Sequence, residues 1–425
     1  MKDMIVQHPR LAQAQKELKS MKIKGDEYDD GPLIDDKGLA RLLPSKDVAD
    51  QLVRIYVDNF ESTYRVLHLP SFWQEYASLW MAPEKGRLAF VSLLLVMLAT
   101  SYCLRGEEQS VFRGDSSLGR EQAIVWIRAC DSWLQAQSQK NTTYSIFQIH
   151  CVSYIAKQIN SIKRKRTWTA AGALVRNAMC AGLHRDAEIV NLRHGNLADK
   201  KVSVFDQEMR RRIWATCSEL ELQMSFDRGM PATLKDVIVD CGPPLNIDDD
   251  ELSPYMEQAP KSRSNSQYTR SSFQYIMHYT WPLRQELLSS FNGRTPQLEY
   301  EEVLVYDRRI VQSIDDIPDW REDKAVVPKS LLQLQLQQLL VVLHRPYVRR
   351  ERRNSRYDYS AVVHLRSAMA ILDIHQKLIR AGSSVFCIFR NDVLGAALSI
   401  CYNFSIAEPN PGETDPRTPS PISIL

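Results

Sequence analysis

Three aspartates, Asp315, Asp316 and Asp319, form the pattern in this chain that most directly suggests chemistry. Carboxylate and phosphate oxygens are the ligands that Mg²⁺ prefers, so a DDxxD motif on a helix can hold magnesium against a diphosphate. Pro318 lies inside the motif, however, and proline usually ends a helix. We therefore expect an acidic helix end followed by a turn. A small-molecule-binding protein or enzyme is the alternative function that this motif leaves open.

The DDxxD pattern resembles that of class I terpene synthases, which carry a second, partner motif. Asn391-Asp392 begins like that partner, but Gly395 and Ser399 stand where a hydroxyl and a carboxylate are expected. The partner motif is incomplete, and this weakens the enzyme alternative.

The triplet His184-Arg185-Asp186 spells the HRD of a protein kinase. A kinase also needs a Gly-rich loop and a DFG motif, and the sequence contains neither. Serine-hydrolase elbows, phosphate-binding Gly-rich loops and HExxH zinc motifs are missing as well. Because His and Arg favour the exposed carbonyls at the end of a helix, we expect the triplet to end one. The sequence predicts no catalytic residues and no enzyme activity.

A run of three arginines, Arg210, Arg211 and Arg212, lies next to Trp214. Glu208 and Arg212 are four residues apart, the spacing of a routine surface pair on a helix. The arginines can alternatively tie neighbouring helices together through bidentate hydrogen bonds. We favour a structural role for them over binding of an effector.

The eight cysteines run from Cys103 to Cys401, and no two have the spacing of a metal clip. Most fall in apolar stretches, which indicates free, buried thiols. We expect no metal and no cofactor in this chain.

Charge and hydropathy exclude little. The net charge of +3 names no partner. Two basic clusters, Lys163–Arg166 and Arg345–Arg356, are typical of nuclear import, of phosphate contacts or of solvated loops. The longest apolar run, Leu88–Thr100, is too short to span a bilayer, so no membrane association is expected.

These residues must be positioned by helices, because apolar residues recur at helical spacing along most of the chain. Ser45, Ser71 and Asp206 stand where they could cap helices. The predicted helices are 45–60, 71–80, Leu88–Leu104, Arg120–Gln137, Ser145–Ile162, Trp168–Leu183, Glu208–Phe226, Tyr268–Phe291, Glu299–Ile314, Lys329–Val342, Tyr359–Arg380 and Val385–Ile400, with a shorter one at Leu11–Met21.

The fold class that follows is all-α: an irregular multi-helix bundle of about a dozen helices in a single large domain. We expect a lead-in at 1–44, the helical domain at 45–404 and a disordered, proline-rich tail at 405–425. Pro243–Ser266 is predicted to be a surface loop or partly disordered segment. Thr233–Val239 is the one stretch that we consider for a strand.

Several stretches of the chain resemble, in the same order, the fungal-specific transcription factor domain, the middle homology region of fungal zinc-cluster transcription factors. They are Leu42–Tyr76, Gly182–Asp186 (GLHRD), Glu208–Trp214 (EMRRRIW), Asp227–Pro231 (DRGMP) and Leu343–Tyr347 (LHRPY). Together they span residues 42–350.

The resemblance implies a regulatory domain in a nuclear regulator of RNA polymerase II genes, acting by interaction or by effector sensing. Family members read DNA through a six-cysteine, two-zinc module placed N-terminal to this domain, and the cysteines of this chain do not match that spacing. Zinc and DNA contacts would therefore belong to that missing module. The transcription machinery, a small-molecule effector and a second copy are the partners it implies. Its motif residues here are His184, Arg185, Asp186, Arg210, Arg211, Arg212, Trp214, His344 and Arg345.

Overall fold

The computed structural model confirms the all-α prediction. It describes residues 13, 36–82, 87–104, 112–113, 116–137, 143–162, 166–186, 202–292, 298–348 and 355–407. Within these ranges the only strands are β1 (Phe112–Arg113) and β2 (Ser116–Ser117), which pair antiparallel. The chain folds into two compact units, Met1–Ser264 with Thr269–Tyr275, and Asn265–Tyr268 with Ile276–Leu425.

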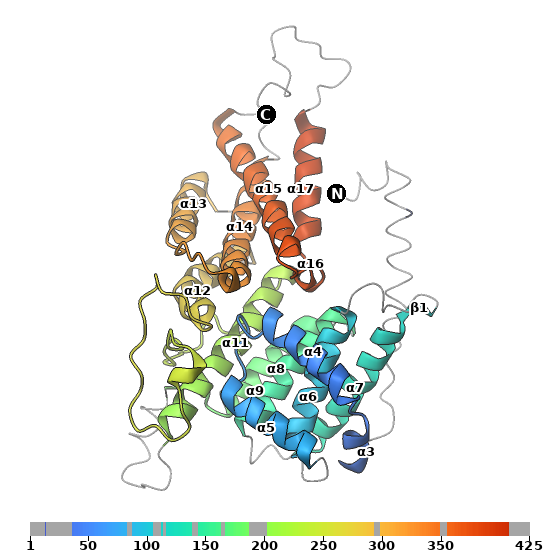
Figure 1. The fold of residues 1–425 in the computed structure, drawn as a ribbon. Helices are drawn as coiled ribbons and strands as arrows, with labels where there is room; N and C mark the ends of the chain where they lie inside the picture. The colour runs from blue at the N-terminus through green and yellow to red at the C-terminus, as the bar shows by residue number, and fades with distance from the viewer. Residues whose placement is uncertain are drawn as a thin grey trace. The chain divides into compact units, whose positions relative to one another are not determined.

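The first unit is built around α6, which packs against α4, α7 and α8 (Figure 1). Helix α6 is apolar on all sides, and its residues from Phe90 to Ser101 are buried, as expected of a core helix. The helices of this unit are α3 (Asp36–Arg41), α4 (Lys46–Asn59), α5 (Leu69–Met81), α6 (Leu88–Ser101), α7 (Leu118–Gln135), α8 (Tyr144–Ile159), α9 (Thr167–Cys180) and α11 (Val204–Arg228), with 3-10 turns η2 (Tyr102–Leu104) and η7 (Asp249–Glu251).

The two ends of α11 explain its length of 25 residues. At its start, the Ser203 side chain accepts a hydrogen bond from the backbone nitrogen of Asp206, at 3.0 Å. At its end, Gly229 adopts the left-handed conformation, with φ of 60°. The prediction that Asp206 caps this helix was wrong: Ser203 is the cap, and Asp206 lies in the first turn, where its charge favours the helix dipole.

Two other predicted caps also differ. Helix α5 starts at Leu69, and the His68 ring accepts from the backbone nitrogen of Ser71, so His68 takes the role predicted for Ser71. Ser45 precedes α4, as predicted, but its side chain makes no capping hydrogen bond.

The segment after α11 corrects a further prediction. Pro243–Ser266 is not a plain surface loop, because it carries buried residues into the unit. Asn246 is fully buried, and its Oδ1 accepts hydrogen bonds from the hydroxyls of Thr269 and Ser272, at 2.7 and 2.8 Å. Thr233–Val239 begins with a turn, continues without regular secondary structure and pairs with no strand.

The second unit is centred on α14, which packs against α13, α15 and α17. Its helices are the C-terminal part of α12 (Ser272–Phe291), which begins in the first unit, and α13 (Tyr300–Asp315), α14 (Val326–Val348), α15 (Asp358–Arg380), α16 (Val385–Phe389) and α17 (Asp392–Ala407), with 3-10 turns η8 (Asp323–Ala325) and η10 (Ser355–Tyr357). The helix predicted at Val385–Ile400 is broken at Arg390, whose backbone is extended.

Among the described residues, the stretch Asp323–Val348 is long and apolar enough to cross a membrane. Most of its apolar window, 72%, is buried within the structure, as in the core helix of a soluble protein. Several predictions lie outside the described residues: Leu11–Met21 apart from Gln13, the basic residues 163–165 and 349–354, and the tail from Glu408.

Candidate functional site

Asp249, on η7, is the centre of a buried ion network in the first unit. Its Oδ1 accepts hydrogen bonds from Arg65 and, at 2.6 Å, from Nη1 of Arg212 on α11. Its Oδ2 accepts from the backbone nitrogen of Leu69 at 2.9 Å, which ties η7 to the start of α5. Burial alone would raise the pKa of Asp249, but the two guanidinium groups hold it well below its ordinary value. The network therefore contains a carboxylate at neutral pH.

Glu208 and Glu61 complete the network. Arg212 Nε donates to Glu208 Oε1 at 2.8 Å, and Glu208 also accepts from the backbone nitrogen of Leu245. Glu61 accepts from the backbone nitrogen of Leu67 through Oε1, and its side chain also interacts with the buried hydroxyl of Tyr56. Burial raises the pKa of Glu61 from 4.5 to about 8. When Glu61 is neutral, the guanidinium groups of Arg65 and Arg212 are balanced by the carboxylates of Asp249 and Glu208.

His68 connects this network to a cavity. Its Nε2 lies 3.1 Å from the Asp249 carbonyl oxygen and 2.9 Å from that of Leu252, so this nitrogen carries the proton. Its Nδ1 accepts from the Ser71 hydroxyl at 2.8 Å. The ring thus holds η7 with one nitrogen and α5 with the other.

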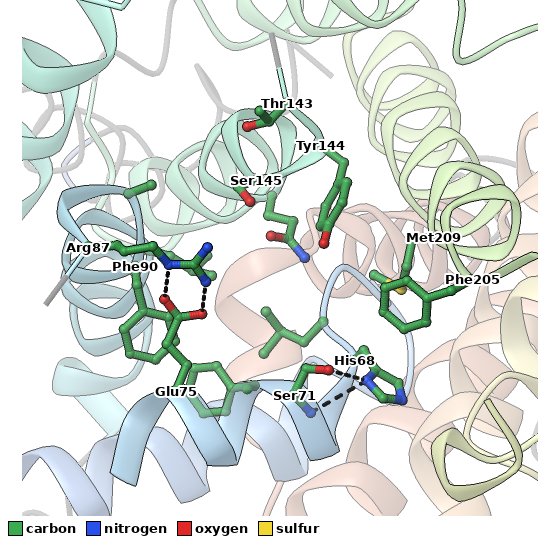
Figure 2. Close-up of a pocket in the computed structure, with 15 residues that line it drawn as sticks. His68, Ser71, Glu75, Arg87, Phe90, Thr143, Tyr144, Ser145, Phe205 and Met209 are labelled. Carbon is green, nitrogen blue, oxygen red and sulfur yellow. Dashed lines mark hydrogen bonds and ion pairs between the residues drawn. The ribbon is translucent and has the colours of Figure 1, made fainter. Parts of the chain in front are cut away.

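The cavity has a volume of about 450 Å³ and lies between α5, α6, α8 and the start of α11. Figure 2 shows His68 and Ser71 on one side, near Phe205 and Met209, and the ion pair of Glu75 with Arg87 on another side. Further apolar walls come from Leu67, Phe72, Phe90 and Leu93. The cavity is large enough for a small molecule, and apolar and polar side chains line it in similar numbers.

Gln148, on α8, is a second polar cavity-lining group that, like His68, is almost completely buried, with 7% exposure. Its Nε2 donates to the Val66 carbonyl, and its amide oxygen accepts no hydrogen bond among the described residues. This amide is a ready acceptor for a ligand that carries a hydroxyl or N–H group.

The signature residues around GLHRD meet in one joint between α9, α11 and the segment that follows α11. Arg210 donates to the Gly182 carbonyl at 2.8 Å, and Arg211 donates to Asp186 at 2.9 Å. Arg185 forms an ion pair with Asp240 at 3.1 Å.

The other two signature residues of this joint are His184 and Trp214. The His184 carbonyl accepts from the backbone nitrogens of Asp240 and Cys241, and its ring lies 5.9 Å from that of Trp214. Gly182 has φ of 69°, so the turn that ends α9 needs a glycine there. The HRD triplet therefore follows a helix end, as predicted, and its partners are structural elements of the same unit.

Arg212 does not join that cluster, because it points into the ion network. The routine surface pair predicted for Glu208 and Arg212 was wrong: both side chains are buried, with exposures of 2% and 0%. In a sequence, a pair of opposite charges four residues apart looks the same whether that face of the helix is solvated or buried.

His344 and Arg345 belong to the second unit, on α14. His344 Nε2 donates to Asp307 at 3.0 Å, and its Nδ1 lies 2.9 Å from the Ser360 hydroxyl. This is the order of a Ser–His–Asp triad, but all three side chains are buried, so no substrate could reach the serine. Arg345, one residue further on, is exposed.

The DDxxD motif is on the surface. Asp315, Asp316 and Asp319 are exposed at the end of α13 and in the turn after it, and Asp319 forms an ion pair with Lys329. Among the described residues, no three His, Cys, Asp or Glu side chains converge to hold a metal ion. The structure gives the magnesium-dependent alternative no support.

Residues 53–280 match the model of the fungal specific transcription factor domain, which is more than half of the chain. The chain belongs to this family. It carries a domain of transcriptional regulators, as the resemblance indicated. The match covers the cavity, the ion network and the GLHRD joint.

Named relatives agree. A transcription factor from Penicillium oxalicum, opdR, is 30% identical over 347 residues, covering 77% of this chain and 42% of the relative. Transcription factor lepE from Aspergillus flavus is 28% identical, covering 78% of this chain and 39% of the relative. A Zn(2)-C6 fungal-type transcription factor, mpsB, from Macrophomina phaseolina is 24% identical, covering 80% and 46%.

The chain thus spans less than half of the length of these relatives. No solved structure matches it.

Proposed function

We propose that this chain is the regulatory domain of a nuclear transcription factor and has no catalytic activity of its own. DNA recognition and zinc binding would belong to a cysteine module of the kind that the Zn(2)-C6 name of one relative indicates. The whole transcription factor would act through contacts with the transcription machinery.

The observation that carries the regulatory part of the proposal is the shared wall between the cavity and the ion network. His68 lines the cavity, and its Nε2 contacts the backbone that carries Asp249. A ligand that displaces the ring by even a fraction of an ångström must move η7 or break its hydrogen bonds. Because Asp249 binds Arg212, such a movement would reach α11.

The ligand that fits is a small molecule with a mainly apolar body and one or two polar groups. The aromatic and aliphatic walls would bury the body, and the Gln148 amide and the Glu75–Arg87 pair would meet the polar groups. The domain would then act as a switch, because α11 would take one position when the cavity is empty and another when a ligand fills it.

Filling the cavity with a side chain tests this proposal. Ser145, on α8, lines the cavity, and we expect Ser145→Trp to exclude ligands and to change transcription. The chain would be joined to a zinc-cluster DNA-binding module and assayed with a reporter gene. Ser145→Trp should change reporter output at least about threefold. Ser78→Trp, an exposed serine of α5 outside the cavity, is the matched control and should leave output unchanged.

Binding is measured on the purified chain with the fluorescent amphiphile 8-anilinonaphthalene-1-sulfonate. Saturable binding that Ser145→Trp abolishes and Ser78→Trp retains would support the cavity as the ligand site. Equal binding by both variants, together with equal reporter output, would contradict the effector proposal.

A further inference from the structure

Three side chains of the second unit form a Cys–His–Asp arrangement on separate helices. Cys387, on α16, lies with its Sγ 3.5 Å from Nδ1 of His375 on α15. The other ring nitrogen, Nε2, lies 2.7 Å from Oδ1 of Asp392 at the start of α17. His375 and Asp392 are buried, whereas Cys387 is only partly buried.

The hydrogen bonds set the protonation of the ring. Burial alone would raise the pKa of Asp392, but Arg390 and His375 hold it below its ordinary value, so Asp392 is a carboxylate. Arg390 Nε donates to its Oδ2 at 2.7 Å, and Nε2–H of His375 donates to its Oδ1. The lone pair of Nδ1 therefore faces the thiol, in the position of a general base with an orienting carboxylate behind it.

We propose that Cys387 is a covalent modification site for small α,β-unsaturated carbonyl compounds. His375 Nδ1 takes the thiol proton as the Sγ electron pair forms a bond to the β-carbon of the acceptor. The π electrons move to the carbonyl oxygen as an enolate, and the imidazolium returns the proton to the α-carbon. Asp392 stabilises the imidazolium in between. The addition needs no oxidant and has no leaving group.

The exposed cysteine of α17, Cys401, provides an internal comparison for the reactivity of Cys387. It has no hydrogen-bonding partner among the described residues and is more accessible than Cys387. Burial raises the pKa of the Cys387 thiol and restricts access to it, and neither effect favours its reaction. Faster addition at Cys387 would require the help of His375.

The test exposes the purified full chain to acrylamide at neutral pH and follows each cysteine-containing peptide over time by mass spectrometry. A positioned general base typically contributes about 10²- to 10⁴-fold, and the lower accessibility of Cys387 offsets part of this gain, so we expect Cys387 to react at least about tenfold faster than Cys401. An equal or slower rate at Cys387 would overturn the proposal.

Two histidine variants separate base catalysis from packing. His375→Gln should slow addition at Cys387 to the rate of Cys401 or below. His364→Gln changes another buried histidine of α15, which contacts Asn403 instead, and should leave the Cys387 rate unchanged. The rate at Cys401 reports local loosening in both variants. Equal slowing of Cys387 by both substitutions would show a packing effect and refute the assignment.

Discussion

At the scale of single residues, the first unit depends on carboxyl groups whose charge is decided by burial together with the groups that face them. Asp249 stays ionised because it accepts hydrogen bonds from two arginines, whereas Glu61 accepts none from an arginine and burial raises its pKa. Each carboxyl lies within the same network, so the difference between them comes from the hydrogen bonds that each accepts: Asp249 accepts from two guanidinium groups and one backbone nitrogen, and Glu61 from one backbone nitrogen.

Glu61 makes the stability of the chain depend on pH. Burial raises its pKa from 4.5 to about 8 in the folded chain. Between these values the folded chain keeps a proton that the unfolded chain has released. The free energy of unfolding therefore falls as the pH rises through this window, by at most about 1.4 kcal/mol per pH unit. The contribution is complete below pH 4.5 and is lost above about pH 8.

Glu61→Gln should remove that slope, since the amide keeps an acceptor for the Leu67 nitrogen and cannot ionise. Urea denaturation between about pH 5 and 8 would measure it, with the exposed Glu257→Gln as the control. A variant that loses stability with pH as steeply as the parent chain would mean that Glu61 is ionised in the folded state.

At the scale of elements, sequence patterns located most helices and failed mainly at their ends. For α11, Ser203 precedes an apolar pair, but Asp206, three residues later, is an acidic residue that looks like the better cap in the sequence. Asp249 was missed for a different reason. It lies in an acidic run, IDDDE, which is typical of a solvated loop, and only Arg65 and Arg212, distant in the chain, make it a core residue.

Replacing glycine by alanine should have opposite effects on stability at two positions of the chain. Gly229 ends α11 with φ of 60°, and a Cβ there would meet open space, so Gly229→Ala tests backbone conformation alone. It should lower the free energy of unfolding by about 1 kcal/mol. Gly395 lies within α17, also in open space but without positive φ, and Gly395→Ala should raise stability by about 0.5 kcal/mol.

Urea denaturation followed by the helical circular dichroism signal measures both variants against the parent chain. Changes of the same sign in the two variants would contradict the assigned backbone conformations.

At the scale of the whole molecule, the fold class and the family could be predicted because they rest on many residues at once: helical spacing over most of the chain and five motifs in a fixed order. The cavity and the ion network could not be predicted from the sequence. They depend on which faces of α5, α8 and α11 meet, and single sequences carry little information about such pairings.

Folding of this chain should be independent of zinc. Its cysteines have no metal-clip spacing, and no metal-binding cluster is formed among the described residues. We expect well under one zinc atom per purified chain and a thermal midpoint that chelation with EDTA does not change. A fusion to a two-zinc cysteine module provides the positive control. Stoichiometric zinc in the unfused chain, or unfolding on chelation, would disprove this expectation.

The Arg65–Asp249 ion pair has a consequence for the order of events during synthesis. The two residues are 184 positions apart in the chain. Until the ribosome has released Asp249, Arg65 lacks the carboxylate to which it donates, and Arg212 has only Glu208 to compensate for its removal from water. The first unit therefore cannot complete its core co-translationally helix by helix. Its closure is a late, long-range event, and a nascent chain stalled before residue 249 should remain a substrate for chaperones.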